Sequence, residues 1–285
     1  MLTTLDTARH LIGISGKDSL ATALFQSNLK PDLPYEYFFN DNGCELPETY
    51  VWLESIEERT GWTITRLDES LEDLIAKKNG FLPSWNARYC TRITKIDPLI
   101  RYSGREKTYF YIGIRADEDR AGFKPFNEKI VPVFPLKEAG ITLPVVWLML
   151  EKADLLPPSF FWERLYNAVC EEYAPVNWES KLSPWQHRML FAGRSRSNCY
   201  FCFYQRRYEW VWLSETHPDL FAKASSFEKT DYTWVKDKSL QQIRSESEEI
   251  FRRRVNKIVK ILKGMDVLDI DNAIALTSCG ALCGK

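Results

Sequence analysis

Short apolar runs alternate with amphipathic segments over the first half of the chain. His10–Ile14 and Tyr35–Asn40 are rich in aliphatic and aromatic residues, and each is followed by a segment in which apolar positions recur with helical spacing. We expect strands at these two ranges and helices at Ser19–Ser27 and Pro47–Thr60. The second helix begins with a proline and ends before Gly61, which is typical of helix boundaries.

The alternation continues to about residue 134. We expect further strands at Thr63–Leu67, Tyr109–Ile114 and Ile130–Phe134. We also expect one helix that is capped by Ser70 and runs through Lys78, and another over Cys90–Tyr102 that Pro98 kinks or restarts. This order predicts an α/β, Rossmann-like fold with a mostly parallel five-stranded sheet and flanking helices. In such sheets ligands bind beyond the carboxyl ends of the strands, where the strand order reverses.

From about Gly140 the pattern becomes helix-rich, with proline-containing joints. Helices are expected at Trp210–Glu215, Pro218–Phe227 and Leu240–Lys263. We therefore expect two domains, a nucleotide-binding α/β domain over residues 1–140 and a helical C-terminal region over residues 141–285.

Composition and charge narrow the class of protein. The chain has 285 residues, enough for one large domain or two small ones, and a formal net charge of −1. No global field therefore draws it to nucleic acid or to a membrane. The first residues show no apolar leader, and the longest apolar run, Val145–Leu150, is too short to span a bilayer. A cytoplasmic protein with no membrane partner is expected, and its seven cysteines favour metal or redox chemistry over disulfides.

The strongest candidate for chemistry is the loop Ser15-Gly16-Lys17-Asp18-Ser19, which directly follows the first expected strand. Backbone N–H groups in a strand–loop–helix turn converge on one point and suit an anion. Lys17 adds a positive charge and the serines add hydroxyls. A carboxylate beside phosphates requires an intervening cation, so Asp18 is a candidate Mg²⁺ ligand. The spacing does not match a Walker A loop.

This loop resembles the PP-loop of ATP pyrophosphatases, usually written Ser-Gly-Gly-Lys-Asp-Ser, although Ile14-Ser15-Gly16 stands where that family has Ser-Gly-Gly. The resemblance implies an enzyme that binds ATP with Mg²⁺, cleaves the bond between the α and β phosphates, joins AMP to an acceptor and releases pyrophosphate.

Three further segments are similar to the phosphoadenosine phosphosulfate reductase-like branch of that superfamily: Phe38–Tyr50, Arg88–Pro98 and Gly113–Arg120. The resemblance implies catalytic roles for Lys17, Asp18 and Arg115. It also implies ATP binding by Ser15, Gly16, Lys17, Asp18, Ser19, Asn40, Asp41, Arg92, Lys95, Gly113 and Arg115.

The charges of these segments fit the same chemistry. Arg92, Lys95, Arg115 and Arg120 would surround a triphosphate, because guanidinium forks and ammonium groups bind phosphate oxygens. Glu118 is either a second metal ligand or, as we favour, an ion-pair partner of Arg120. Cys44 and Cys90 fall near the expected cleft, and Cys90, among basic residues, is the better candidate for a reactive thiol.

Four cysteines of the second half form two close pairs, Cys199-x2-Cys202 and Cys279-x3-Cys283. Two such pairs can supply four thiolates to one metal ion or cluster, and Cys170 could replace one of them. The alternative is two structural thiol pairs without metal. The residues leave zinc and a [4Fe–4S] cluster open, and the resemblance to sulfur-handling proteins favours the cluster.

Gln205–Trp210 and Glu215–Phe221 resemble a subgroup that includes the ATP pyrophosphatase of bacterial DNA phosphorothioation. This resemblance implies a cysteine desulfurase or other sulfur-transfer subunits as partners, DNA as an acceptor, and a homo-oligomer as one option. Arg252-Arg253-Arg254, Lys257, Lys260 and Lys263 form a basic stripe that could follow a phosphate backbone or be an ordinary solvated helix face.

Two other functions are carried forward. The tail Ser278-Cys279-Gly280-Ala281-Leu282 partly resembles the Glu-Cys-Gly-Leu-His motif of phosphoadenosine phosphosulfate and adenosine phosphosulfate reductases, but lacks its Glu and His. A reductase is therefore the second hypothesis. The third is a non-catalytic nucleotide-sensing subunit of a modification or defence complex.

Overall fold

The computed structural model describes residues 8–120, 122, 128–173, 178–230 and 232–264. The chain divides into two compact units, the first formed by residues 1–74 and 88–158, the second by residues 75–87 and 159–285. The division at residue 140 that we expect from the sequence stays a prediction.

The first unit is built on one five-stranded sheet. Its strands are β1 (Arg9–Gly13), β2 (Tyr35–Asp41), β3 (Ile64–Asp68), β4 (Thr108–Tyr111) and β5 (Ile130–Val133). They lie in the order β3-β2-β1-β4-β5, and every neighbouring pair is parallel. The expected Rossmann-like fold is confirmed. The chain moves outward from β1 through β2 to β3 and then crosses to β4 on the other side, so the strand order reverses between β1 and β4.

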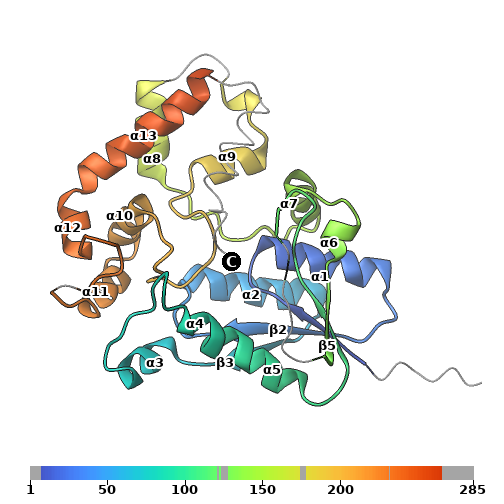
Figure 1. Ribbon diagram of the computed structural model, residues 1–285. Helices are drawn as coiled ribbons and strands as arrows, with labels where there is room; N and C mark the ends of the chain where they lie inside the picture. Colours follow the sequence, from blue (N-terminus) through green and yellow to red (C-terminus); the bar gives the residue numbers. More distant parts are fainter. Residues whose placement is uncertain (1–7, 121, 123–127, 174–177, 231, 265–285) are drawn as a thin grey trace, which may run out of the picture. The chain divides into compact units, whose positions relative to one another are not determined.

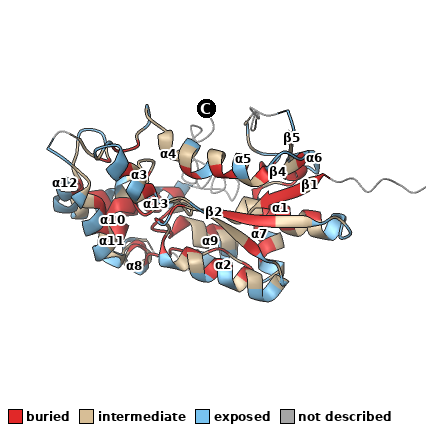
Figure 2. Ribbon diagram, turned by 90° about the horizontal axis from the view of Figure 1, so that it is seen from below, coloured by how far each residue is buried: buried red, intermediate tan, exposed pale blue. Residues whose placement is uncertain are grey.

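Helices cover both faces of this sheet (Figure 1). The helical elements over residues 17–152 are α1 (Lys17–Leu29), α2 (Pro47–Thr60), α3 (Leu71–Lys77), α4 (Tyr89–Thr91), a π-helical turn (Arg92–Ile96), α5 (Asp97–Ser103), α6 (Pro135–Glu138) and α7 (Leu143–Lys152). The helices α1 and α2 lie on one face, where α6 and α7 pack on α1, and α5 lies on the other. The central strand is buried between the layers, as the red colouring of β1 in Figure 2 shows.

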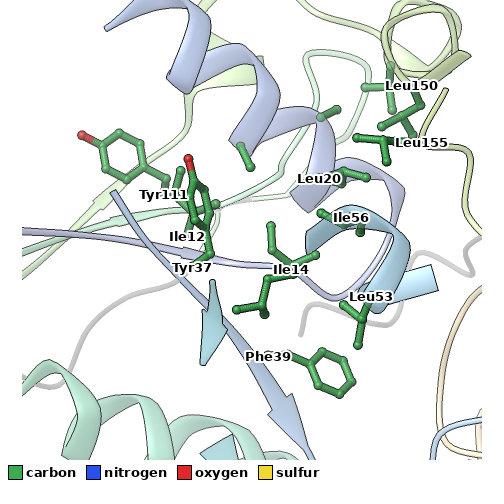
Figure 3. Close-up of a cluster of buried hydrophobic side chains, with 14 of the residues drawn as sticks. Ile12, Ile14, Leu20, Tyr37, Phe39, Leu53, Ile56, Tyr111, Leu150 and Leu155 are labelled. Carbon is green, nitrogen blue, oxygen red and sulfur yellow. The ribbon is translucent and has the colours of Figure 1, made fainter. Parts of the chain in front are cut away.

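The period-two pattern of the strands divides the core into two clusters. Ile12, Ile14 and Tyr37 point to the α1 face and pack with residues of α1, α2 and α7, as Figure 3 shows. Leu11 and Phe38 point to the opposite face and pack with Leu99 of α5. Burying an aliphatic or aromatic side chain of this size stabilises a fold by about 1.5–3 kcal/mol. The sheet is therefore held from both sides.

Pro98 does not interrupt the helical segment that the sequence predicts around it. Residues 89–103 form three consecutive helical pieces, and Pro98 lies in the first turn of α5. The piece before it is wider than an α-helix, and the Asp97 N–H donates to the Arg92 carbonyl. Because proline has no N–H, the ladder loses a donor at this point, and the wide turn coincides with that loss.

The second unit is helical, as expected. Its elements are α8 (Glu163–Glu172), a 3-10 turn (Glu179–Lys181), α9 (Pro184–Leu190), α10 (Arg207–Thr216), α11 (Pro218–Ser226), α12 (Leu240–Ser245) and α13 (Ser247–Gly264). The helix α10 packs against α11, α12 and α13, and its Trp210 side chain is fully buried. None of the described helices is both long and apolar enough to cross a membrane.

The expectation of one helix over Leu240–Lys263 is wrong. The segment forms α12 and α13, and Glu246 lies between them with φ −96° and ψ 10°. The Glu246 carboxylate pairs with Lys238, which lies before α12. Serine on both sides of Glu246 has a lower helix propensity than alanine or leucine, which favours a break there.

Candidate functional site

Two loops of the first unit meet where the strand order reverses. One follows β1 and leads into α1, and the other follows β4. The Ile14 N–H donates to the Phe38 carbonyl (2.7 Å), so the end of β1 is tied to β2 up to the residue before the loop. The loop Ser15–Ser19 therefore begins at a fixed point on the carboxyl edge of the sheet.

The loop is closed by the hydroxyl of Ser19. Its Oγ accepts hydrogen bonds from the N–H groups of Ser15 (2.9 Å) and Gly16 (3.0 Å) and donates to the Gly16 carbonyl (2.9 Å). The amides of residues 17–19 form the first turn of α1, where N–H groups have no acceptor inside the helix. These amides and the helix dipole are available to an anion.

Gly113 allows the exit of β4 to touch the start of α1. A Cβ atom at this position would lie 2.6 Å from the Asp18 backbone carbon, 2.7 Å from its oxygen and 2.8 Å from the Ser19 nitrogen. A real Cβ atom essentially never lies this close to another heavy atom, so only glycine fits without a shift of the backbone. The two loops are therefore in van der Waals contact through Gly113.

Arg115 joins the same two loops through ion pairs. Its Nη1 lies 2.8 Å from Asp18 Oδ1 and 3.4 Å from Glu118 Oε1, and its Nε lies 3.0 Å from Asp117 Oδ1. Glu118 also pairs with Arg120 at 2.6 Å. The ion pair that we expect between Glu118 and Arg120 is confirmed, and Arg115 is a second partner of the same carboxylate. The Arg115 side chain is only 10 % exposed.

The ionisation of Asp18 reflects these neighbours. Burial by itself raises the pKa of the carboxyl, but the charges of Lys17 and Arg115 and their hydrogen bonds outweigh it, and the pKa of Asp18 is lowered from 3.8. Lys17 Nζ lies 2.9 Å from Asp18 Oδ2. The pKa of Arg115 is raised, since its carboxylate partners outweigh burial. The site therefore holds Asp18 as a carboxylate and Arg115 as a charged guanidinium at neutral pH.

An amide and a carboxylate side chain, Asn40 and Asp41, lie at the end of β2, the next strand of the sheet. Asn40 Oδ1 is buried and has no hydrogen-bond partner among the described residues. Asp41 Oδ1 accepts from the Tyr50 hydroxyl (2.8 Å) and from the Gly43 N–H (2.9 Å). An unsatisfied buried acceptor costs about 1–3 kcal/mol, so Asn40 is ready to accept a hydrogen bond from a ligand.

The remaining nucleotide residues predicted from the sequence lie in the helical segment after residue 88. Arg92 and Lys95 are exposed, and the Arg92 Nε lies 3.8 Å from Asp97 Oδ1. The π-helical turn that carries them packs near β2. The side chain of Arg92 is 79 % exposed, and its role as a phosphate ligand stays a prediction.

Sequence reasoning missed two residues at this site. Asp117 binds the Nε of Arg115, and Tyr50 fixes Asp41. A signal existed for Asp117, because it lies two residues after Arg115. Tyr50 is nine residues from Asp41 across a helix start, and the sequence offers no signal for that pairing.

Cys44 and Cys90 lie near the ends of these elements. The Cys44 thiol is buried and donates to Glu72 Oε1 at 3.9 Å. The Cys90 carbonyl accepts from the Thr94 hydroxyl at 2.9 Å. Both thiols are reduced, and a reactive role for Cys90 stays a prediction.

In the second unit, the turn that carries Cys199 and Cys202 is held by buried side chains. The Arg194 guanidinium, 2 % exposed, donates to the carbonyls of Asn198 (2.8 Å) and Cys199 (3.1 Å). Gln205 Nε2 donates to the Tyr200 carbonyl at 2.6 Å. The Cys202 N–H donates to the Cys199 carbonyl at 3.0 Å. The backbone of the Cys-x2-Cys turn is therefore fixed before any metal binds.

The other two predicted thiolate ligands, Cys279 and Cys283, lie outside the described residues, and Cys170 lies on α8 beside Tyr166. Within the described ranges no group of three or more His, Cys, Asp or Glu side chains is placed to hold a metal ion. A single carboxylate such as Asp18 is enough for Mg²⁺, which usually takes one or two protein carboxylates together with phosphate oxygens and water. The donor types therefore fit Mg²⁺ at Asp18 and a soft metal at Cys199 and Cys202.

A separate groove of about 570 Å³ lies in the first unit, lined by residues that include His10, Lys30 and Glu138. None of the predicted nucleotide ligands lines it. The His10 ring is stacked on Tyr109 at its base, and its Nδ1 lies 2.8 Å from the Tyr111 hydroxyl. These rings are held by each other and by the strands, so we assign the groove no part in the nucleotide site.

Comparison with protein families gives one match. The model of the phosphoadenosine phosphosulfate reductase domain matches residues 10–169, more than half of the chain. The matched range contains β2–β5, all of β1 except Arg9, and both loops of the switch point. Comparison with curated proteins gave no match, and neither did comparison with solved structures.

Proposed function

The chain belongs to the phosphoadenosine phosphosulfate reductase family, and from this premise we propose that it is an ATP pyrophosphatase that adenylates an acceptor for sulfur incorporation. The family domain uses an adenine nucleotide in sulfur-related chemistry. The proposal adds the nucleotide, ATP, and the bond that is cleaved, between its α and β phosphates.

One observation carries the proposal. Asp18 and Arg115 lie 2.8 Å apart at the switch point, beside the first amides of α1. A cation ligand, a guanidinium and helix N–H groups are the three components that a triphosphate with Mg²⁺ requires. Without nucleotide, Arg115 and Asp18 neutralise each other. With nucleotide, each has a partner of opposite charge, a phosphate for Arg115 and Mg²⁺ for Asp18.

Each residue of the site has a separate role in this reaction. Lys17 and the α1 amides bind phosphate oxygens, and Arg115 stabilises the charge that grows on the leaving pyrophosphate as the acceptor oxygen attacks the α-phosphorus. Mg²⁺, when bound at Asp18, would neutralise phosphate charge. Asn40 and Asp41 at the end of β2 hold the adenosine, and the buried Asn40 Oδ1 supplies an acceptor for an amino group or hydroxyl.

The acceptor that we favour is a phosphate of the DNA backbone, as in DNA phosphorothioation. Adenylation would let this phosphate oxygen leave as part of AMP when the terminal sulfur of a persulfide, on a cysteine desulfurase or another sulfur-transfer subunit, attacks the phosphorus. A thiol reductant would then cleave the resulting disulfide and leave the sulfur on the DNA. Support comes from the resemblance of two segments to the subgroup that includes the ATP pyrophosphatase of DNA phosphorothioation. Gln205–Trp210 lies at the start of α10, and Glu215–Phe221 runs from the end of α10 into α11.

We further propose that Cys199 and Cys202, together with Cys279 and Cys283, bind a [4Fe–4S] cluster, with zinc as the alternative. Support comes from the fixed turn around Cys199 and Cys202. Iron and zinc analysis of anaerobically purified protein decides between them. Absence of both metals would leave two structural thiol pairs.

The test of the main proposal is the product formed from ATP. The protein is incubated with ATP, Mg²⁺, duplex DNA and a sulfur-transfer partner, and pyrophosphate, orthophosphate and AMP are measured. Pyrophosphate release that Asp18→Asn and Arg115→Ala both abolish supports the proposal. Release of orthophosphate, or of nothing, contradicts it.

A reductase acting on phosphoadenosine phosphosulfate or adenosine phosphosulfate is the second candidate, favoured by the family match itself. It requires a free thiol at Cys279. Sulfite formation that Cys279→Ser abolishes without loss of bound metal would support it. Tight ATP binding with neither pyrophosphate nor sulfite formed would instead support the third candidate, a nucleotide-sensing subunit.

A further inference from the structure

The long helix α13 of the second unit has one apolar and one basic side. Ile250, Phe251, Val255, Ile258 and Ile261 are buried, whereas Arg252, Arg253, Lys257, Lys260 and Lys263 are exposed. At 100° per residue, the exposed cations fall within an arc of about 140°. They span 12 residues, or about 16 Å along the axis from the first to the last.

The acidic residues of α13 do not dilute this arc. Both lie in its first turn, Glu248 paired with Arg164 and Glu249 paired with Arg253. From residue 250 to residue 264 the helix contains no Asp or Glu. Four exposed cations, Arg252, Lys257, Lys260 and Lys263, make no ion pair with an acidic side chain of the described residues.

Other cations lie close to this arc. Burial, and then the charges of Arg254 and Arg206, lower the pKa of Lys257. Arg206 comes from the start of α10, so two elements contribute positive charge to the same region. Like charges held together cost free energy unless an anion binds among them.

The structure corrects the stripe predicted from the sequence in one position. Arg254 is buried, its Nη2 donates to the Leu190 carbonyl at 3.0 Å, and its guanidinium lies 4.5 Å from the centre of the Tyr208 ring. It belongs to the packing of α13 rather than to its exposed face.

We propose that the face of α13 formed by Arg252, Arg253, Lys257, Lys260 and Lys263 docks the phosphate backbone of duplex DNA. A straight helix with cations at fixed intervals suits a polyanion whose charges are also fixed in space. Single strands are bound largely by base stacking on exposed aromatic side chains. The exposed arc of α13 carries no aromatic residue, and Tyr173, whose ring centre lies 5.4 Å from Lys263 Nζ, is half-buried. The face makes phosphate contacts only, so binding is independent of base sequence.

This inference rests on the proposed function for its biological role, because it identifies where the acceptor DNA would be held. The binding itself is tested without ATP. Failure of DNA binding with pyrophosphate release intact would contradict the docking face alone, and the reverse result would contradict the proposed reaction alone.

The experiment measures the fluorescence anisotropy of a labelled duplex of about 25 base pairs with the whole protein, at salt concentrations between about 50 and 200 mM. Wild-type protein is compared with Lys257→Glu/Lys260→Glu. The control is Lys152→Glu/Lys236→Glu, which changes the net charge equally at exposed lysines outside α13. Melting temperatures establish that both variants are folded.

We expect the wild-type affinity to fall with salt, with a slope of log K against log salt of about −3 to −5 for four or five phosphate contacts. The α13 variant should lose about tenfold or more in affinity, and its slope should be shallower by about 2. The control should change the affinity by no more than about twofold and should leave the salt slope unchanged. Equal loss in both variants, equal binding of single-stranded DNA, or displacement of the duplex by poly-glutamate at equal charge would overturn the proposal.

Discussion

The guanidinium of Arg115 lies 2.8 Å from the carboxylate of Asp18, although the two residues are 97 positions apart. The contact joins the loops after β1 and β4 across the point where the strand order reverses. It also means that the groups best suited to Mg²⁺ and to phosphate contact each other directly. ATP binding, as proposed above, requires this ion pair to open.

Replacing Asp18 with Asn should separate binding from reaction. The change removes the Mg²⁺ ligand and releases Arg115 from one carboxylate. We expect nucleotide affinity without Mg²⁺ to be kept or raised and pyrophosphate release to fall at least about a hundredfold. Calorimetric titration with ATP, with and without Mg²⁺, measures the first effect. Unchanged pyrophosphate release would remove Asp18 from the reaction.

Arg115 should not be replaceable by Lys. One guanidinium reaches Asp18 and Glu118 through Nη1 and Asp117 through Nε, and a single ammonium group cannot reproduce that fork. We expect Arg115→Lys to lose most of the pyrophosphate release and Arg115→Ala to lose about 1–3 kcal/mol of stability as well. Urea denaturation together with product assays would show both effects. Full activity of the Lys variant would argue against a phosphate contact.

Gly113 should tolerate no side chain. The Cβ of Gly113→Ala would meet the backbone of Asp18 at 2.6 Å, so either loop must move. We expect a loss of about 1–3 kcal/mol in the free energy of unfolding and weaker ATP binding. Gly16→Ala is the matched control, because no atom lies within 4 Å of its added Cβ and its φ is 170°, an extended backbone. That variant should keep its stability to within about 0.5 kcal/mol.

Stability should fall in acid, and two carboxylates contribute. The pKa of Asp18 is lowered from 3.8 despite burial, and the hydrogen bond from Arg9 lowers the pKa of Glu36 from 4.5. A group with a depressed folded pKa stabilises the protein above its unfolded pKa and loses that contribution as pH falls through the folded value. The melting temperature should therefore drop below about pH 4.5, and less steeply in Glu36→Gln. An identical pH profile for both proteins would contradict this assignment.

Arg254 and Lys260 should respond differently to truncation, although both were part of the stripe predicted from sequence. Arg254→Ala removes a buried side chain that bonds the Leu190 carbonyl and packs on Tyr208, so we expect a loss of about 2–3 kcal/mol in stability. Lys260→Ala changes an exposed residue and should stay within about 0.5 kcal/mol. Thermal denaturation of the two variants tests the contrast.

Much of the first unit could be predicted from the sequence because its signals are local. The period-two pattern of Leu11, Ile12 and Ile14 determines which side chains face each helical layer. Glycine after α2, at Gly61 with φ 70°, marks the helix end. The break at Glu246 was missed because it depends on a contact with Lys238, and the burial of Arg254 was missed because it depends on α9 and α10.

The sequence by itself determined the alternation of strands and helices, the loop Ser15–Ser19 and the set of charged residues that could serve a nucleotide. It could not place Gly113 against Asp18, or show that Arg115 pairs with three carboxylates. Those facts depend on the sheet order, which brings β4 beside β1 although almost a hundred residues separate them. Local patterns encode elements, whereas distances across a sheet are fixed only when the whole sheet has formed.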